Sequence, residues 1–195
     1  IIGQVDFSLF YTRNTDLIEY IFGIYPDPET HEGAYGFRAS NTEHSRVYGF
    51  EIETSLNRNF QDVNTSIRAG YTYLYPVEFD INSRNDSAVF LKYRRSHALN
   101  IVTNFAYNKF DLGLNLFYRS EILNIDDVFL NELTREELLP GFYDYWNQNN
   151  KGYFLLDGFL SYHFNERYTL SFGVKNITNT EYMGRPGDIR PHRSY

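Results

Sequence analysis

The sequence predicts an all-β protein, specifically an antiparallel transmembrane β-barrel, and three observations carry this prediction. Apolar and polar residues alternate along most of the chain, and a period of two places each set on one face of a strand. Aromatic residues make up 18% of the sequence, with 18 Tyr and 17 Phe, and they are enriched in strands because they pack well on a pleated surface. Short and long connections follow one another in turn, as they do in outer-membrane barrels.

Composition excludes several classes of protein. The formal net charge of −7 and the pI of about 5.2 argue against nucleic acid as a partner, because no basic stripe is available to neutralise phosphates. Cysteine is absent, which removes disulfides and thiolate metal sites. The mean hydropathy is −0.49, and no apolar run is long enough for a transmembrane helix. A membrane barrel has such an average because its lumen-facing residues are polar.

The alternating runs are predicted as strands of one portion of a barrel that covers residues 1–195. They span residues 5–12, 16–22, 48–56, 65–75, 99–107, 112–118, 154–164 and 168–174. The clearest run is 65–75, in which Ile67 and Tyr71 share one face while Ser66 and Arg68 share the other. The first two runs either turn at Asn14-Thr15 or form one long strand with a bulge.

The predicted connections alternate in length. They cover residues 23–43, 57–64, 76–93, 108–109, 121–151, 165–167 and the segment after 174. Because the short and long ones alternate, we expect all long loops to project from one end of the sheet. Within the longest connection, Leu130 to Leu139 is predicted as a short helix.

The two faces of the predicted sheet differ in chemistry. One face carries aliphatic residues in mid-strand and Tyr or Phe near the strand ends, as expected of aromatic girdles at the bilayer interfaces. The other face is polar, with Glu51, Glu53, Arg68, Asn100, Asn104, Asn115, Arg119, Asp157 and Lys175. A dry core would penalise such unpaired groups, whereas a wet or plugged lumen would not. A soluble sandwich explains the alternation but not the one-sided long loops.

No catalytic constellation stands out, so we expect neither an enzyme nor a cofactor or metal site. The five histidines are dispersed without the spacing of metal ligands, and the G-x-S-x-G nucleophile motif is absent. Acidic residues gather in the longest connection, at Asp126, Asp127, Glu132, Glu136 and Glu137. They could bind calcium, but a solvated acidic face is the preferred interpretation.

Candidate ligand contacts lie in two predicted external loops. Tyr143, Tyr145 and Trp146 fall in the longest connection, where exposed aromatic side chains suit ligand binding. The alternative for them is packing that anchors the loop onto the rim. Arg185 lies in the Gly- and Pro-rich last loop, where it could attract an anionic ligand or belong to a structural turn.

The order of several motifs resembles the C-terminal part of the barrel of TonB-dependent outer-membrane receptors. The motifs are LFYTRNTDLIEY (9–20), RVYGFEIETSL (46–56), AGYTYLYP (69–76), RRSHALNI (94–101), NERY (165–168), VKNITNTEY (174–182) and GRPG (184–187). Residues 174–179 depart from the family's usual N-L-F-D segment. The resemblance implies a plugged barrel of about 22 strands, of which this chain supplies about the last eight, with 9–20 as part of one long strand. We therefore expect both ends to lie inside a larger protein.

The resemblance also implies a function and its partners. It implies energised uptake of a scarce nutrient, such as an iron-siderophore, haem, cobalamin or a glycan, across the cell outer membrane of a Gram-negative bacterium. The implied partners are outer-membrane lipid, the protein's own plug domain, the TonB system acting through that plug, and a small nutrient ligand or a surface-exposed partner protein. The alternatives are a structural or binding subunit of a larger outer-membrane assembly and, less favoured, a soluble carbohydrate-binding sandwich.

Overall fold

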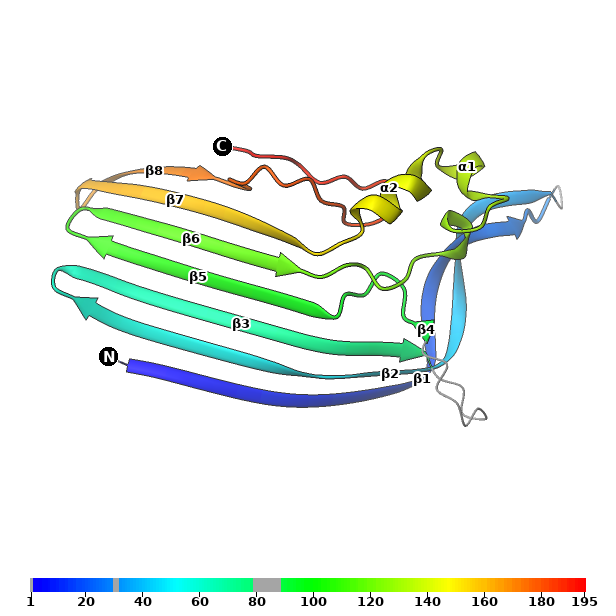
Figure 1. Ribbon diagram of the computed structural model, residues 1–195, viewed down its shortest axis with the longest axis horizontal. Helices are drawn as coiled ribbons and strands as arrows, with labels where there is room; N and C mark the ends of the chain where they lie inside the picture. Colours follow the sequence, from blue (N-terminus) through cyan, green and yellow to red (C-terminus); the bar gives the residue numbers. More distant parts are fainter. Residues whose placement is uncertain (1, 30–31, 79–88) are drawn as a thin grey trace.

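The computed structural model describes residues 2–29, 32–78 and 89–195 and contains one antiparallel eight-stranded sheet (Figure 1). Its strands are β1 (Ile2–Pro26), β2 (Gly33–Phe60), β3 (Val63–Glu78), β4 (Val89–Phe90), β5 (His97–Tyr107), β6 (Phe110–Arg119), β7 (Tyr153–Asn165) and β8 (Tyr168–Val174). The strand order is β1-β2-β3-β5-β6-β7-β8, and the short β4 pairs with β3. The predicted all-β fold is confirmed.

The pairing register gives the sheet one apolar and one polar face. One continuous row of paired residues on the apolar face is Phe7, Ile52, Tyr71, Leu99, Tyr118 and Phe154. A row on the opposite face is Gln4, Ser55, Arg68, Val102, Asn115 and Asp157. Because side chains alternate along every strand, the register extends each chemistry across the sheet, as a wall between lipid and a wet lumen requires.

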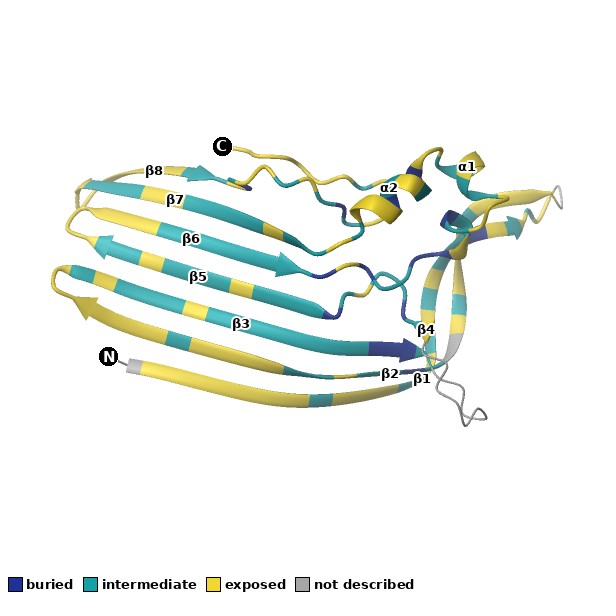
Figure 2. Cartoon of the chain, viewed as in Figure 1, coloured by how far each residue is buried: buried dark blue, intermediate teal, exposed yellow. Residues whose placement is uncertain are grey.

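Among the described residues, no second layer of protein packs on the apolar face of the sheet. In Figure 2 the strands are intermediate or exposed over most of their length, while buried residues concentrate at the end that carries the helices. Leu9 and Phe7 on β1 are 74% and 60% exposed, and Leu170 and Phe172 on β8 are 64% and 58% exposed. An exposed apolar surface of this extent marks contact with a membrane or another apolar partner.

The connections separate by length between the two ends of the sheet. The turns β2–β3, β5–β6 and β7–β8 lie together at one end, and the helices, β4 and the β1–β2 connection lie at the other (Figure 1). This confirms that the long connections share one end, called the loop end below. The β7–β8 turn is closed by Asn165, whose Oδ1 accepts hydrogen bonds from the Arg167 and Tyr168 backbone N–H groups at 2.9 and 3.1 Å.

The loop predicted at residues 23–43 is wrong. β1 continues to Pro26 and β2 begins at Gly33, so most of this range is paired strand. The prolines and acidic residues that suggested a loop gather around the tip, whereas the segments on either side pair and bring Phe22 and Phe37 into contact at 4.8 Å between ring centroids. β1, with 25 residues, is far longer than the roughly 10 residues that span a bilayer, so the β1–β2 hairpin extends beyond the membrane.

Three further boundaries differ from the prediction. Residues 5–22 form one strand without a turn, as the resemblance implied, and its register is the same on both sides of Asp16, so no bulge is inserted. The predicted turn at 57–64 shortens to two residues, with Gln61 at φ 52°. In the predicted loop at 76–93, β3 runs on to Glu78 and β4 forms at Val89–Phe90, while 79–88 lie outside the described residues.

The longest connection contains three short helices. They are η1 (Asp127–Phe129), α1 (Arg135–Leu138) and α2 (Phe142–Asn149). The helix predicted at 130–139 is therefore only partly correct, because α1 covers its second half and the longer α2 follows Gly141, whose φ of 75° suits a residue without a side chain. Within the described ranges, no helix is long and apolar enough to cross a membrane.

Candidate ligand-binding site at the loop end

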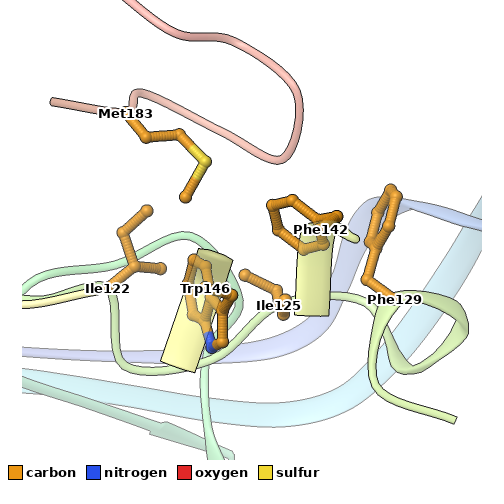
Figure 3. Close-up of a cluster of buried hydrophobic side chains, with 6 residues drawn as sticks. All are labelled: Ile122, Ile125, Phe129, Phe142, Trp146 and Met183. Atoms are coloured by element: carbon orange, nitrogen blue, oxygen red, sulfur yellow. The ribbon is translucent and has the colours of Figure 1, made fainter. Parts of the chain in front are cut away.

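A cluster of buried apolar side chains organises the loop end (Figure 3). We call it the rim cluster, and its members are Ile122, Ile125, Phe129, Phe142, Trp146 and Met183. All of them are at most 9% exposed. Since they come from the 120–152 connection and from the segment after β8, the cluster holds these two loops together by burying apolar surface.

Backbone hydrogen bonds attach the longest connection to the segment before β5. The Ser120 and Leu123 N–H groups donate to the carbonyls of His97 and Arg94 at 3.0 and 2.8 Å. In the other direction, the Tyr93 N–H donates to the carbonyl of Asn124 at 2.7 Å. Residues 120–124 therefore continue the pairing of β5 and β6 beyond the strands proper, which fixes where the rim cluster begins.

Asp126 is a buried carboxylate at the centre of the loop end. Its side chain is fully buried, and Lys92 Nζ lies 3.2 Å from its Oδ1. Its Oδ2 accepts hydrogen bonds from the Tyr93 hydroxyl and from the Phe22 backbone N–H, the latter at 3.2 Å. A buried carboxylate is tolerated only when it is paired and hydrogen-bonded in this way.

Tyr93 is held in its protonated form. Burial, reinforced by the hydrogen bond to Asp126 and by the carboxylate's charge, raises the pKa of the Tyr93 hydroxyl well above its usual range. Ionisation would place a second negative charge against Asp126 in a poorly solvated site. The Tyr93 hydroxyl therefore remains a hydrogen-bond donor to Asp126 at physiological pH.

A cavity of about 410 Å³ lies beside this carboxylate. Its aromatic and cationic lining residues are Tyr20, Phe22, Phe37, Lys92, Tyr93, Arg94, Phe129 and Arg185, and we call it the rim cavity. Its size falls in the range of small-molecule sites. The walls come from β1, β2, the segment before β5, η1 and the last loop, so the cavity exists only because these separate segments meet.

The segment after β8 contacts β7 and the segment before β5. The Asn176 N–H donates to Asp157 Oδ1 at 2.8 Å, and the rings of Tyr153 and Tyr182 lie 4.8 Å apart. The Arg95 guanidinium donates to the carbonyl of Met183 at 3.1 Å. These contacts hold the last loop against the loop end, where Arg185 lines the rim cavity.

The structure separates the four predicted ligand contacts. Arg185 lines the rim cavity, and its guanidinium carbon lies 5.5 Å from the centroid of the Tyr93 ring. Trp146 is 8% exposed inside the rim cluster, which is the packing role given as its alternative. Tyr143 packs under the guanidinium of Arg135 at 3.9 Å. These placements do not test ligand contact, which stays a prediction for all of them.

Tyr145 lies at a second cavity, of about 310 Å³, together with Tyr153 and Tyr182. Its hydroxyl donates to Glu181 Oε1 at 2.6 Å. This hydrogen bond raises the pKa of Tyr145 to about 12, with burial as the second cause. The contact joins α2 to the last loop, so Tyr145 has a structural partner whether or not a ligand binds beside it.

Sequence reasoning missed most of the rim cavity. Lys92 and Tyr93 fell in the predicted loop at 76–93, Arg94 was noted only as the start of the RRSHALNI motif, and Phe22 was read only as the end of a strand. Two cations on either side of a tyrosine are the signal that could have drawn attention to residues 92–94. No local signal in the sequence points to their meeting with Phe22.

The acidic residues of the longest connection do not form one solvated face. Asp126 is buried against Lys92, whereas Asp127 and Glu132 are exposed. Across the described ranges, no group of three or more His, Cys, Asp or Glu side chains is placed to hold a metal ion. Of the histidines, His163 contacts Asp111 at 2.6 Å, and His31 lies outside the described residues.

A sheet with one apolar and one polar face, short turns at one end and loop-built cavities at the other is the wall of an outer-membrane β-barrel. The family model described as TonB dependent receptor-like, beta-barrel, matches residues 2–177. The chain belongs to this family, whose members are transporters rather than enzymes, and its place is the outer membrane of a Gram-negative bacterium. No curated protein matches the chain.

Solved structures of receptors share the fold. The ferric-catecholate import receptor Fiu from E. coli K12, in its closed form, is similar with a TM-score of 0.60 and 18% identity, over 98% of this chain and 23% of that one. The siderophore receptor PirA from Acinetobacter baumannii is similar with a TM-score of 0.58 and 14% identity, over 98% and 28%. The chain thus spans only 23% to 28% of the length of these receptors.

Proposed function

We propose that this chain is part of the wall and external rim of a receptor for energised uptake of a scarce nutrient, with an anionic iron-siderophore as the favoured ligand. The rim cavity is the observation that carries the proposal. It combines aromatic rings with the cations of Lys92, Arg94 and Arg185 in about 410 Å³. The loop end is then the external end, where a ligand arrives from outside the cell.

The chemistry of the rim cavity favours a ligand with negative charge and flat groups. Aromatic side chains such as Phe22 and Phe129 offer large contact area at small entropic cost. Arg185 presents a guanidinium that can hydrogen-bond to carboxylate or catecholate oxygens, and its planar group also stacks on rings. An anionic chelate with aromatic arms uses both features, whereas an uncharged glycan uses the cations poorly.

The solved relatives support the same ligand class. Fiu is described as a ferric-catecholate import receptor and PirA as a siderophore receptor. Their likeness to this chain is one of fold, so it favours an iron-siderophore over haem or cobalamin only by association. The lining of the rim cavity supports an iron-siderophore independently of these structures.

The polar face of the sheet is compatible with contact to a plug domain, through which the proposed energising system would act. In a plugged barrel, Glu53, Arg68 and Asn100 would face the plug or water, and they surround a polar hollow together with Asp6. A plug of this kind would connect to TonB and open the path inward. This chain would then supply wall and ligand capture, while the moving part would belong to the plug.

Uptake of radioactive iron tests the proposal. Cells that express the intact receptor, and lack other siderophore receptors, are supplied with iron-55 bound to catecholate, hydroxamate or mixed siderophores. We expect accumulation of at least one complex, and its loss when the inner-membrane energiser is deleted. Accumulation that is unchanged without the energiser would contradict the proposal, and so would the absence of uptake for every complex.

A second candidate is a binding subunit of a larger outer-membrane assembly. The β1–β2 extension favours it, because Tyr20 and Phe37 are 72% and 69% exposed beyond the membrane span. A partner protein docked there would cover both rings. Cross-linking from this extension to another protein in cells without iron uptake would favour the second candidate over the first.

A further inference from the structure

Among the described residues, the side chain of Asp126 binds groups that line the rim cavity. Lys92 Nζ, the Tyr93 hydroxyl and the Phe22 N–H are its partners, and all three residues line the cavity, whereas Asp126 does not. The Asp126 carboxylate lies behind the cavity lining and holds Lys92, Tyr93 and Phe22, which face the cavity. The side chain of Asp126 is fully buried, so a ligand in the rim cavity would meet its partners and not the carboxylate itself.

Asp126 joins parts of the barrel that are distant in sequence and in the sheet. Phe22 precedes it by 104 residues, and β1 is separated from the β5–β6 region by β2 and β3. A parallel apolar contact runs beside this link, because the rings of Phe22 and Phe129 stack at 5.7 Å. η1 begins at the same point, since the Phe129 N–H donates to the Asp126 carbonyl at 3.1 Å.

The same carboxylate sets the charge of the rim cavity. It neutralises Lys92, and Glu19 lies 3.9 Å from Arg94. Among the described cations that line the cavity, Arg185 has no carboxylate within salt-bridge distance. Arg185 rests over the ring of Tyr93, whose hydroxyl Asp126 holds. Asp126 therefore influences the position of Arg185 through one intermediate residue, Tyr93.

We infer that Asp126 is a positioning residue that assembles the rim cavity before any ligand arrives, by tying the β1–β2 extension to residues 92–93 and orienting the platform under Arg185. The inference rests on the proposed function for the role of the cavity. Its structural content, a preset rim organised by one buried carboxylate and its three partners, does not depend on which ligand binds. A ligand meeting a preset cavity spends less of its binding energy on ordering the loops.

Distance measurements by pulsed electron paramagnetic resonance test this inference without ligand. Residues 1–195 contain no cysteine. With any cysteine elsewhere in the intact receptor replaced by serine, spin labels can be attached to Ala39→Cys on the extension and Glu132→Cys in the longest connection. Asp126→Asn keeps an oxygen for Tyr93 and Phe22 but removes the salt-bridge partner of Lys92. Breaking one half of a buried ion pair should raise the open-rim population on the order of a hundredfold, seen as a broad distance distribution in place of a narrow one.

Two comparison variants give the test its direction. Asp127→Asn removes the exposed neighbouring carboxylate, and we expect it to keep the narrow distribution. Adding Lys92→Met to Asp126→Asn removes the unpaired charge, and we expect it to restore the narrow distribution, which a merely space-filling role of Asp126 would not predict. A narrow distribution in Asp126→Asn, equal broadening in Asp127→Asn, or no rescue by Lys92→Met would each overturn the inference. Since no ligand is present, a failed uptake experiment leaves this result unaffected.

Discussion

Phe22 of β1 stacks on Phe129 of η1, with ring centroids 5.7 Å apart and ring planes 13° from parallel. The contact joins the β1–β2 extension to the connection that follows β6. In the sheet, β6 is four strands away from β1. Both rings border the rim cavity and the rim cluster. The stability of the external loops and the shape of the proposed ligand site therefore depend on the same pair of side chains.

Replacement of Phe129 by alanine should loosen the rim without unfolding the wall. Phe129 is 9% exposed, and truncation of a buried phenylalanine costs about 3 kcal/mol. Hydrogen exchange of the amides of residues 120–150 should accelerate, while that of β5 and β6 stays slow. Leu133→Ala is the matched control, because Leu133 is 85% exposed and its truncation should leave exchange unchanged. Equal exchange in the two variants would contradict the assignment of Phe129 to a stabilising cluster.

The wall itself has a close contact that a single methyl group would disturb. A Cβ at Gly49 of β2 would overlap the backbone carbonyl of Tyr73 on β3. Gly49→Ala should therefore destabilise the folded barrel by about 1–3 kcal/mol, measured by urea unfolding in lipid vesicles. Gly36→Ala adds the same methyl group where nothing lies within 4 Å, so it should unfold at the urea concentration of the unchanged protein. A Gly49→Ala barrel that matches Gly36→Ala would show that β2 and β3 approach less closely.

The Tyr145–Glu181 hydrogen bond should make one contact of the last loop sensitive to alkaline pH. The folded pKa of Tyr145, about 12, is above the ordinary value of 10.0. The contact is therefore fully present below pH 10 and is lost as the pH rises through about 12. Glu181→Gln should shift the pKa of Tyr145 towards 10. Phenolate absorbance follows the titration, and subtracting the signal of the same protein with Tyr145→Phe isolates the contribution of Tyr145. An unshifted titration would mean that the hydrogen bond does not form.

The strands were predictable because each is built from a local alternation. β7 and β8 appear within one residue of their predicted ranges at each end, and the cross-strand register continues the apolar face that the alternation defines. The β1–β2 extension was not predictable in the same way. Its two segments contain glycines, which ordinarily indicate a loop. They form strands because residues 17–26 and 33–42 hydrogen-bond to each other.

The candidate site was predictable only in part, for a related reason. Arg185 was identified because a cation in a glycine- and proline-rich loop stands out locally. Asp126 looked like one acid in a solvated acidic stretch, and its burial follows from contacts with Lys92 and Phe22, which lie on other parts of the chain. The spacing of Phe142 and Trp146, four residues apart, was the available signal for α2.

The most direct test is the affinity of the intact receptor for the ferric siderophore that it takes up. The affinity is measured by quenching of the fluorescence of Trp146, the only tryptophan of this chain. Any tryptophan outside residues 1–195 is replaced by phenylalanine. Arg185→Ala should weaken binding about tenfold through loss of the cation over the aromatic wall. Arg190→Ala is the matched control, because Arg190 is engaged with Asp188 at 2.9 Å and does not line the rim cavity. Weakened binding in Arg185→Ala alone is the predicted result. Equal affinities in the two variants would contradict the assignment of the rim cavity as the ligand site.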